Sequence, residues 1–351
     1  LGIIIFERKA FYMIKVTLTN EILSYITEIE QNRYKVSSVK LSKAVMNRLR
    51  KNSKKKSSYA SNKIEGNPLS EKQVDEVIES DERKHYLKPE QEVRNYFLAL
   101  NYLEEKVNKK EKFSKKLILD VQKLVEKGAS KEKIGLRGPM PPGVLFAVYD
   151  SKTGNPDYIP PEYCDIPGLL DELIEYVNTT DDHPLIVAAV VHYQLVTMHP
   201  FEDGNGRTAR LLSGYIMDLN GYGFNGVGSL DEYFAYDIDE YYESIQMGLP
   251  ALYYSGRENP PHPEIWIHYF LRMVKLYSGK VCDLQLASEE EDIVGSLSFL
   301  KEKEKELLQF LMKNYRGEFT PIEVSREMSV TNKTIINRLA VLVKNGFVIP
   351  I

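Results

Sequence analysis

Residues 197–210 contain side chains that together could transfer a group from a nucleotide to a hydroxyl. His199 can take a proton from an attacking hydroxyl near neutral pH. Asp203 offers a hard oxygen ligand for a magnesium ion that arrives with the phosphates. Arg207 and Arg210 lie on one helix face, from which forked guanidinium groups can reach the outer phosphates. Each residue alone is commonplace, but their order and spacing favour this chemistry.

The flanking residues predict two helices that hold this stretch in place. Residues 184–196 form an apolar helical pattern, and residues 208–219 form a second helix. The loop between them ends at a helix N-terminus, where free backbone N–H groups favour an anion. Gly204 and Gly206 allow a sharp turn and a close approach of the backbone to a ligand. The sequence therefore predicts a phosphate cradle at 204–206.

Residues 199–210 resemble the signature of the Fic family, His-x-Phe-x-Asp/Glu-Gly-Asn-Gly-Arg-x-x-Arg, with every defined position matched. The resemblance implies a mainly α fold with a Fic-type helical core, ATP and Mg²⁺ as co-substrates, and transfer of AMP to a Ser, Thr or Tyr hydroxyl of a target protein. The related Doc toxins, which act as kinases, carry Ala-Asn-Lys in place of Gly-Asn-Gly, so AMP transfer is favoured here. The implied roles are general base for His199, metal ligand for Asp203, anion hole for Gly204, Asn205 and Gly206, binding of the β and γ phosphates for Arg207 and Arg210, and loop anchor for Phe201.

A second informative stretch covers residues 57–66. Ser61 and Glu65 are four residues apart and share a helical face, Gly66 suits a C-terminal cap, and Pro68 stops the helix. Alone, this pattern is typical of an ordinary short surface helix. Beside the signature it resembles the inhibitory helix motif of the Fic family, Ser/Thr-x-x-x-Glu-Gly/Asn. The resemblance implies that Glu65 pairs with Arg210, takes the γ-phosphate position and keeps the enzyme off by default.

Residues 135–161 replace the helical pattern with Gly, Pro, β-branched and aromatic residues. A strand at 144–149, a turn at 151–157 and a return at 158–159 predict a small β-hairpin with a free edge. Such an edge suits capture of an extended target segment, and the hairpin resembles the Fic flap. The alternative is a hairpin with a purely structural role. Segment 138–142 departs from the usual Fic pattern ahead of the strand, so target specificity is not predicted. The candidate docking residues are Val144, Leu145, Phe146, Ala147 and Val148.

Residues 231–246 carry an aromatic stripe, which is usually part of a core. By the Fic resemblance, Tyr241 and Tyr242 fall where the nucleoside pocket is lined, so one of them is a candidate to pack against adenine. His183 and His192 are expected to be capping or core residues rather than catalytic ones.

The whole chain has 351 residues, 43% hydrophobic and 27% charged, with a net charge of −4. Nothing global indicates nucleic acid or a membrane, so such a function would have to be local. The basic run at 51–56 is interpreted as a solvated helix end or loop rather than a nucleic-acid patch. Cys164 and Cys282 are too few for a disulfide framework, which favours a reducing cytoplasm. No apolar run approaches the roughly 20 residues that a membrane span needs.

The scaffold is expected to be helical on both sides of the catalytic stretch. Helices are predicted from 18 to about 50, at 70–77 with Ser70 as N-cap, at 90–107, at 113–127 with Ser114 as cap, at 167–178 and at 264–277. The expected divisions are an extension at 1–12, an N-terminal helical region at 13–110, a catalytic core at 111–278, a linker at 279–300 and a further domain at 301–351.

Residues 301–351 resemble a winged helix-turn-helix, with helices at 304–314, 321–328 and 332–344 followed by a short wing. The segment is only mildly basic, so DNA binding, protein interaction and intramolecular packing all stay open. Two alternatives to AMP transfer also stay open. One is removal of AMP with help from Glu65, and the other is a DNA-binding regulator that senses nucleotide. A homodimer is likewise left open.

Overall fold

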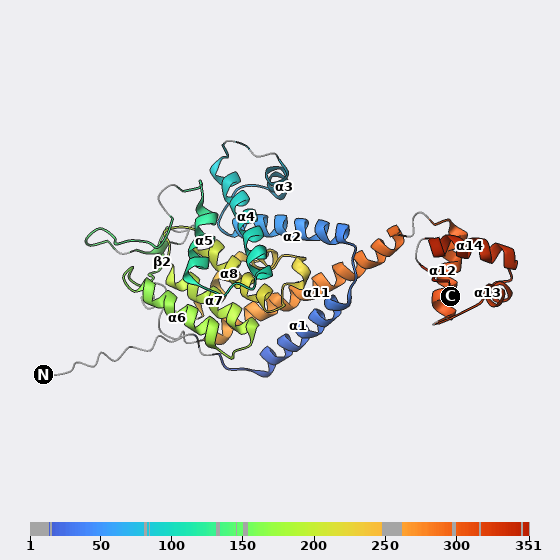
Figure 1. The fold of residues 1–351 in the computed structure, drawn as a ribbon. Helices are drawn as coiled ribbons and strands as arrows, with labels where there is room; N and C mark the ends of the chain where they lie inside the picture. The colour runs from blue at the N-terminus through green and yellow to red at the C-terminus, as the bar shows by residue number, and fades with distance from the viewer. Residues whose placement is uncertain are drawn as a thin grey trace. The chain divides into compact units, whose positions relative to one another are not determined.

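The computed structural model describes residues 14, 16–80, 83, 85–130, 134–144, 146–149, 154–247, 262–296, 300–315, 317–344 and 347–350. The predicted extension at 1–12, Leu145 of the flap, 151–153 of its turn and Gly346 lie outside the described residues. The described residues are mainly helical, as predicted (Figure 1). In chain order the elements are α1 (Asn20–Ser38), α2 (Lys43–Ile64), α3 (Glu71–Glu79), α4 (Lys88–Asn108), α5 (Lys115–Glu126), β1 (Val148–Tyr149), β2 (Pro156–Tyr158), α6 (Ile166–Thr179), α7 (Pro184–Met198), α8 (Asn205–Leu219), the 3₁₀ helix η1 (Phe224–Gly226), α9 (Asp231–Phe234), α10 (Ile238–Gln246), α11 (Pro263–Ser296), α12 (Glu302–Asn314), α13 (Pro321–Glu327) and α14 (Asn332–Lys344).

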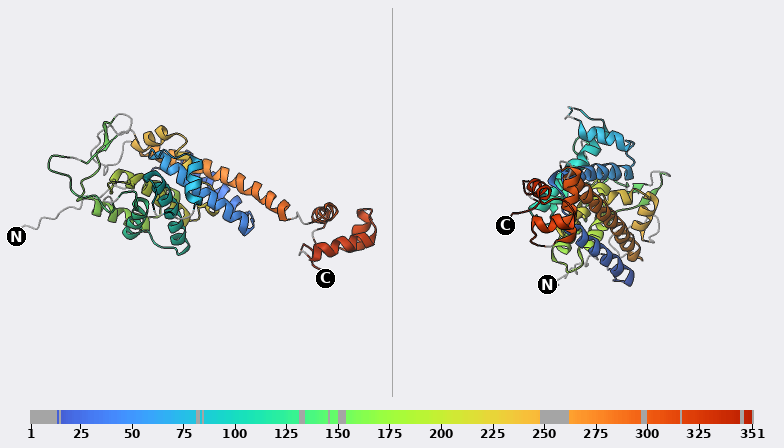
Figure 2. Two further views of the ribbon diagram at one scale, coloured as in Figure 1. Left: turned by 90° about the horizontal axis from the view of Figure 1, so that it is seen from above. Right: turned by 90° about the vertical axis from the view of Figure 1, so that its right-hand side faces the viewer.

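Helix α7 forms the centre of the unit Leu1–Leu286. Its side chains are apolar on all sides and almost all are buried, which is typical of a helix inside a core. Helix α8 packs along α7, and α2, α4, α5 and α6 pack around this pair (Figures 1 and 2). α8 begins at Asn205, three residues earlier than predicted, so Gly206 and Arg207 belong to its first turn.

The caps confirm several predicted helix starts, whereas α2 differs from its prediction. The Ser70 side chain accepts from Gln73 N, and the Ser114 side chain accepts from Leu117 N. The helix predicted from 18 to about 50 is divided, because Ser42 caps a new helix, α2. The short helix expected near 57–66 is the end of this 22-residue α2. The basic run at 51–56 is therefore inside a helix rather than at a helix end or in a loop.

The β-hairpin is present but shorter than predicted. β1 and β2 are antiparallel, with Val148 opposite Tyr158. Pro160 and Pro161 follow β2 closely and have no N–H to donate, so the ladder cannot extend on that side. Leu136, ahead of the flap, forms a bridge with Phe201 instead. The segment that leads into the hairpin is thereby tied to the loop that follows α7.

Helix α11 continues without a break through most of the predicted linker at 279–300. The predicted linker is therefore helical up to Ser296, and the division between the two units, at Leu286 and Ala287, lies within it. The second unit, Ala287–Ile351, contains α12, α13 and α14 around its own apolar core. Its described residues contain no strand, so the predicted wing is not confirmed.

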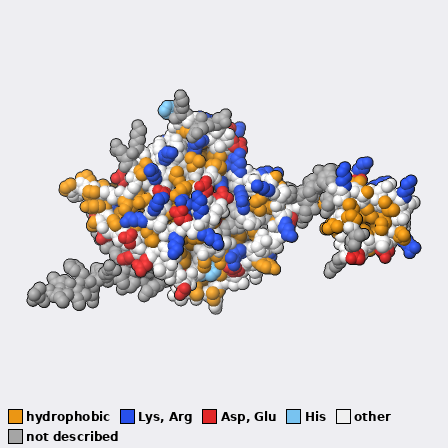
Figure 3. Space-filling view, viewed as in Figure 1, with side chains coloured by type: hydrophobic (Ala, Val, Ile, Leu, Met, Phe, Trp, Pro, Cys, Tyr) orange, Lys and Arg blue, Asp and Glu red, His pale blue; other side chains and the backbone are white. Residues whose placement is uncertain are grey.

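The surface of the unit Leu1–Leu286 mixes both signs of charge. Figure 3 shows Lys and Arg side chains interspersed with Asp and Glu over the viewed face of this unit. Among the described residues, no helix combines the length and the apolar character that a bilayer crossing requires.

Candidate active site

The loop after α7 is fixed by Phe201 and Asn205. His199 caps α7 with left-handed backbone, φ 45° and ψ 59°. Phe201 lies in the core and is 1% exposed. Asn205 Oδ1 accepts from Phe201 N at 3.0 Å, and Asn205 Nδ2 donates to Phe201 O at 2.9 Å. The Asn205 side chain therefore holds the shape of the turn instead of facing a ligand.

Gly204 and Gly206 bring the start of α8 against two carboxylates. Gly204 has φ +79°, and a Cβ added there would lie 2.6 Å from Glu126 Oε1. A Cβ added to Gly206 would collide with Glu65 Oε1. The first N–H groups of a helix lack helical acceptors and favour an anion. The carboxylate of Glu65 occupies the space beside Gly206 where such an anion would lie.

Arg210 is buried and bound to the end of α2. Its side chain is 1% exposed, and Nη2 lies 2.7 Å from Glu65 Oε1. Nε donates to Ser61 Oγ at 2.7 Å, and Nη2 donates to Ser61 O at 2.9 Å. The two residues of the second motif thus meet Arg210 together, because both lie on one face of α2. Gly66, with φ +78°, supplies the left-handed turn just after Glu65.

A second polar layer lies behind Arg210, and sequence reasoning did not find it. Asp231 Oδ1 is 3.8 Å from Arg210 Nε, and Tyr96 donates to Asp231 Oδ2 at 3.1 Å. Burial raises the pKa of Asp231 to about 6, although Arg210 opposes the rise. Asp231 starts a short helix far along the chain, so no local pattern links it to Arg210.

Arg207 points into the protein, and its binding of an outer phosphate stays a prediction. Its side chain is 4% exposed, and Nη2 lies 2.9 Å from Glu126 Oε1 and 3.4 Å from Asp203 Oδ1. The first turn of α8 directs Arg207 toward α5, where Glu126 is itself only 1% exposed. Sequence reasoning missed Glu126. A signal did exist, because Glu126 follows Ile118 and Gln122 at helical spacing on the buried face of α5.

The imidazole of His199 is held in its neutral form. Burial lowers the pKa of His199 to about 4, and the nearby Arg137 guanidinium adds to the effect. Nδ1 lies 3.3 Å from Val196 O. A carbonyl oxygen can only accept, so this bond assigns the proton to Nδ1 and makes Nε2 the basic nitrogen.

Asp203 is the candidate metal ligand at the edge of the loop. Its side chain is 31% exposed, and Oδ1 accepts from Gly204 N at 2.8 Å. The described residues contain no group of three His, Cys, Asp or Glu side chains that could hold a metal ion. Mg²⁺ is commonly bound through one or two carboxylates together with phosphates and water. The partly exposed carboxylate of Asp203, beside an anion-favouring helix terminus, fits that mode of binding.

The two candidate adenine-packing tyrosines lie in different environments. Tyr241 is 1% exposed, and its hydroxyl lies 3.3 Å from Arg210 Nη1 and 3.0 Å from His192 Nε2. Its ring is therefore buried under Arg210 and offers no open face to adenine. Tyr242 is 43% exposed, so adenine packing stays a prediction for that residue. His192 is fully buried, in agreement with its expected core position.

The flap lies next to His199. The ring centroids of Phe146 and His199 are 5.9 Å apart. On the return strand, Tyr158 donates to Thr197 O at 2.6 Å, which fastens β2 to the end of α7. The other described flap residues are half-buried or exposed, namely Val144, Ala147 and Val148.

Curated proteins from two organisms are similar in sequence to part of the chain. Protein adenylyltransferase Fic of Drosophila grimshawi is 27% identical over 204 residues, 56% of this chain and 40% of that protein. Protein adenylyltransferase fic-1 of Caenorhabditis briggsae is 35% identical over 152 residues, 41% of this chain and 27% of that protein. The chain thus spans two fifths or less of the length of these two curated relatives.

A solved structure and a family model are also similar to the chain. The crystal structure of a Fic family protein from Desulfovibrio desulfuricans G20 has a TM-score of 0.61 at 19% identity, over 95% of this chain and 92% of that one. This likeness shows the fold. The model of the Fic/DOC family matches residues 40–217, about half of the 351-residue chain. Since that match includes the signature at 199–210, the chain belongs to the Fic/DOC family.

Proposed function

We propose that the chain is a Mg²⁺-dependent protein adenylyltransferase that moves AMP from ATP to a Ser, Thr or Tyr hydroxyl of a target protein. We further propose that Glu65 keeps the enzyme inactive by binding Arg210. Family membership supports the reaction class, because the two relatives described above are named protein adenylyltransferases. The neutral imidazole of His199 beside the start of α8 supports the chemistry.

In this reaction His199 is the general base. The hydroxyl oxygen of the target forms a bond to the α-phosphorus, the bond to pyrophosphate breaks, and the hydroxyl proton passes to Nε2 of His199. Burial lowers the pKa of His199 to about 4, so the base is already neutral at pH 7. Asp203 would hold Mg²⁺, which neutralises phosphate charge when bound. The N–H groups at the start of α8 would bind phosphate oxygens.

The observation that carries the inhibition proposal is the contact of Glu65 with both Arg210 and the space beside Gly206. The carboxylate of Glu65 lies 2.7 Å from Arg210 Nη2 and would collide with any Cβ on Gly206. A triphosphate that enters this space meets a like charge and finds Arg210 already bound. A hydrogen bond between charged groups contributes about 1.5–3 kcal/mol. At 1.4 kcal/mol per factor of ten, removal of Glu65 should tighten ATP binding about ten- to hundredfold.

Glu65→Gly tests both parts of the proposal. AMP incorporation from labelled ATP into a host lysate, and into the chain itself, should rise in this variant, and ATP should bind more tightly by calorimetry. Glu79→Gly is the matched control, because Glu79 of α3 pairs with Lys55 of α2, and its replacement removes an ion pair that does not include Arg210. Incorporation should disappear in the double variant Glu65→Gly/His199→Ala. Equal incorporation by Glu65→Gly and the wild type would contradict the inhibition proposal, and retained incorporation in the double variant would contradict the role of His199.

Removal of AMP from a modified target is a second candidate, because Glu65 lies close to His199. Burial lowers the pKa of His199, and the Glu65 carboxylate opposes this effect through its charge. Glu65 is 32% exposed and could assist a water molecule that attacks the AMP phosphorus. With a target adenylylated beforehand, the wild type should release AMP and Glu65→Gly should not. Release by Glu65→Gly at the wild-type rate would rule this reaction out for Glu65.

DNA binding by the second unit is a separate proposal, supported by its helix-turn-helix. Ser329 has φ 52° in the turn between α13 and α14, and α14 exposes Asn332, Lys333 and Asn337. The surface is mixed, because apolar side chains gather on the face of this unit seen in Figure 3 and Lys and Arg lie toward its rim. Fluorescence titration of the full chain with random duplex DNA at low and moderate salt tests it. Absence of salt-dependent binding removes the DNA proposal.

A further inference from the structure

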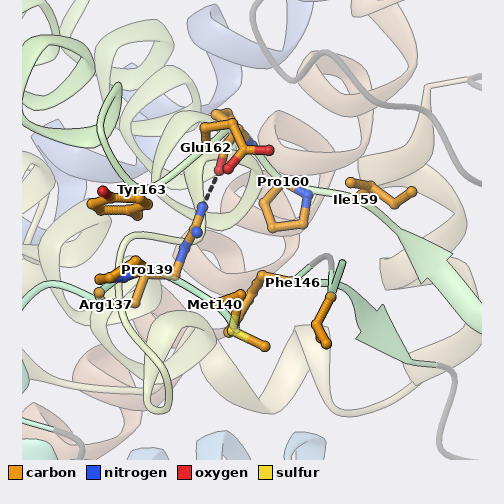
Figure 4. A pocket seen from close by; sticks show the side chains of 11 residues that line it. Arg137, Pro139, Met140, Phe146, Ile159, Pro160, Glu162 and Tyr163 are labelled. Carbon is orange, nitrogen blue, oxygen red and sulfur yellow. Dashed lines mark hydrogen bonds between the residues drawn. The ribbon is translucent and has the colours of Figure 1, made fainter. Parts of the chain in front are cut away.

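Arg137 lies between the flap and the loop that carries His199. It is 5% exposed and forms one wall of a cavity of about 110 Å³ beside the flap. Figure 4 shows its guanidinium turned toward segment 160–163. The backbone is also tied to the loop, because Arg137 N donates to Pro200 O at 2.9 Å.

The side chain of Arg137 joins three separate parts of the site. Nε donates to the carbonyl oxygen of His199 at 2.9 Å. Nη2 donates to the carbonyl oxygen of Pro161, just after the flap, as the dashed line in Figure 4 marks. The guanidinium carbon lies 4.6 Å from the centroid of the Phe146 ring, in cation–π geometry. Each of these contacts uses a different part of the planar fork, which a lysine cannot reproduce.

The backbone that Arg137 holds is in an unfavourable conformation. His199 has φ 45°, a left-handed geometry that crowds the Cβ of any residue other than glycine. Such a conformation persists only where the surrounding contacts fix it. The bond from Arg137 Nε to the His199 carbonyl is one of these contacts, and it sets the direction in which the chain leaves α7.

We propose that Arg137 is a positioning residue that fixes His199 in its left-handed conformation and connects the base to the flap. This inference rests on the proposed function of His199 as general base. Phe146 contacts both Arg137 and His199, so the three residues form one group that spans the flap and the base. The hydrogen bonds described for the Arg137 side chain reach neither α8 nor α2. Loss of the guanidinium should therefore leave the phosphate-binding start of α8 in place.

The charge of Arg137 gives the proposal a second readout. The charged groups that face His199 are Arg137, Glu65 and Asp203. Burial is the main cause of the lowered pKa of His199, Arg137 lowers it further, and the two carboxylates raise it. Removal of the guanidinium charge should therefore raise the pKa of His199. Replacement by lysine keeps a positive charge but loses the planar guanidinium. It therefore separates the effect of the charge on the pKa of His199 from the effect of the hydrogen bonds on the position of His199.

The experiment compares Arg137→Lys and Arg137→Gln in the Glu65→Gly background. Both should lower kcat about ten- to hundredfold, as expected for a misplaced catalytic group, with the Kd for ATP changed less than threefold. The pKa of His199, measured by NMR titration of the full chain, should rise in Arg137→Gln and stay unchanged in Arg137→Lys. Arg33→Gln is the matched control, because Arg33 lies 4.8 Å over the Tyr222 ring, away from His199. It should change neither quantity.

The outcomes separate this inference from the proposed function. An inactive Glu65→Gly variant would refute AMP transfer by the unblocked site, and the NMR titration would still decide the inference about Arg137. A wild-type kcat in Arg137→Gln, or an unchanged pKa of His199 in that variant, overturns the inference. If Arg137→Gln loses its near-ultraviolet circular dichroism, Arg137→Lys decides alone. In that case a wild-type kcat overturns the proposal, and a reduced kcat with unchanged ATP affinity supports it.

Discussion

Replacement of Glu126 by glutamine should remove a pH-dependent loss of stability from the unit Leu1–Leu286. Burial raises the pKa of Glu126 from 4.5 to about 7, and the pairing with Arg207 only partly opposes the rise. The folded state thus favours the protonated carboxyl. The stability that this preference contributes is fully present below pH 4.5 and is lost as pH rises through about 7. Glutamine does not titrate, so the variant lacks this loss.

The size of the effect follows from the same values. Each pKa unit corresponds to about 1.4 kcal/mol, so the rise from 4.5 to about 7 corresponds to roughly 3 kcal/mol. Between pH 5 and pH 8, the unfolding free energy of the wild type minus that of Glu126→Gln should fall by about this amount. The variant also lacks the counter-ion of Arg207, which changes its unfolding free energy by a similar amount at every pH. The change of the difference between pH 5 and pH 8 therefore excludes this contribution.

Urea unfolding without Mg²⁺, followed by tryptophan fluorescence, measures this difference. Trp266 is the only tryptophan of the chain and is buried against α7, so it reports on this unit. Glu79→Gln is the control. Lys55 lowers the pKa of that exposed carboxyl, so the difference should move slightly in the opposite direction. A difference for Glu126→Gln that stays constant from pH 5 to pH 8 would refute the reasoning.

Three further predictions concern the loop and the base. His199→Ala in the Glu65→Gly background should lower AMP transfer by about 10²- to 10⁴-fold, with the calorimetric Kd for ATP nearly unchanged; a large loss of ATP binding would count against a purely chemical role. The kcat/KM of Glu65→Gly should fall at acid pH with an apparent pKa well below 6.5, because burial lowers the pKa of His199 to about 4 and the base acts only when neutral. An acid limb at or above 6.5 would contradict the lowered pKa of His199. Asn205→Ala should destabilise the unit Leu1–Leu286 by roughly 1–3 kcal/mol, because two buried groups of Phe201 lose their partner; urea unfolding without a shift in midpoint would contradict this.

Local sequence patterns predicted the parts of the site that lie within one stretch of chain. The Gly-Asn-Gly turn, the flanking helices and the Ser70 and Ser114 caps depend on neighbours a few residues away. Residues 57–66 were informative for the same reason, because helical spacing places Ser61 and Glu65 on one face.

Partners from distant segments could not be predicted in this way. Glu126 precedes Arg207 by 81 residues, and only the packing of α5 against α8 brings them together. Spacing predicts that Arg207 and Arg210 share a helix face, but it does not predict which neighbouring helices contact them. The continuation of α11 was missed because polar residues after 278 looked like a linker. A helix can continue through polar sequence where one side still contacts a core, as buried Val281, Cys282 and Gln285 show.

The length of α2 determines how Glu65 can leave Arg210. Polar contacts fasten the middle of α2 to residues 225–232, through Arg50 Nε to Asn225 O at 2.6 Å, Gly228 N to Ser53 Oγ at 2.6 Å and Ser57 Oγ to Ser229 Oγ at 2.8 Å. Withdrawal of the whole of α2 breaks all of these hydrogen bonds, and each contributes about 0.5–1.5 kcal/mol to stability. Unwinding of the last turn leaves them in place, and the glycine at 66 already ends the helix there. Fraying at the tip is the less costly route, so amide protons at 61–65 should exchange with solvent ahead of those at 45–57.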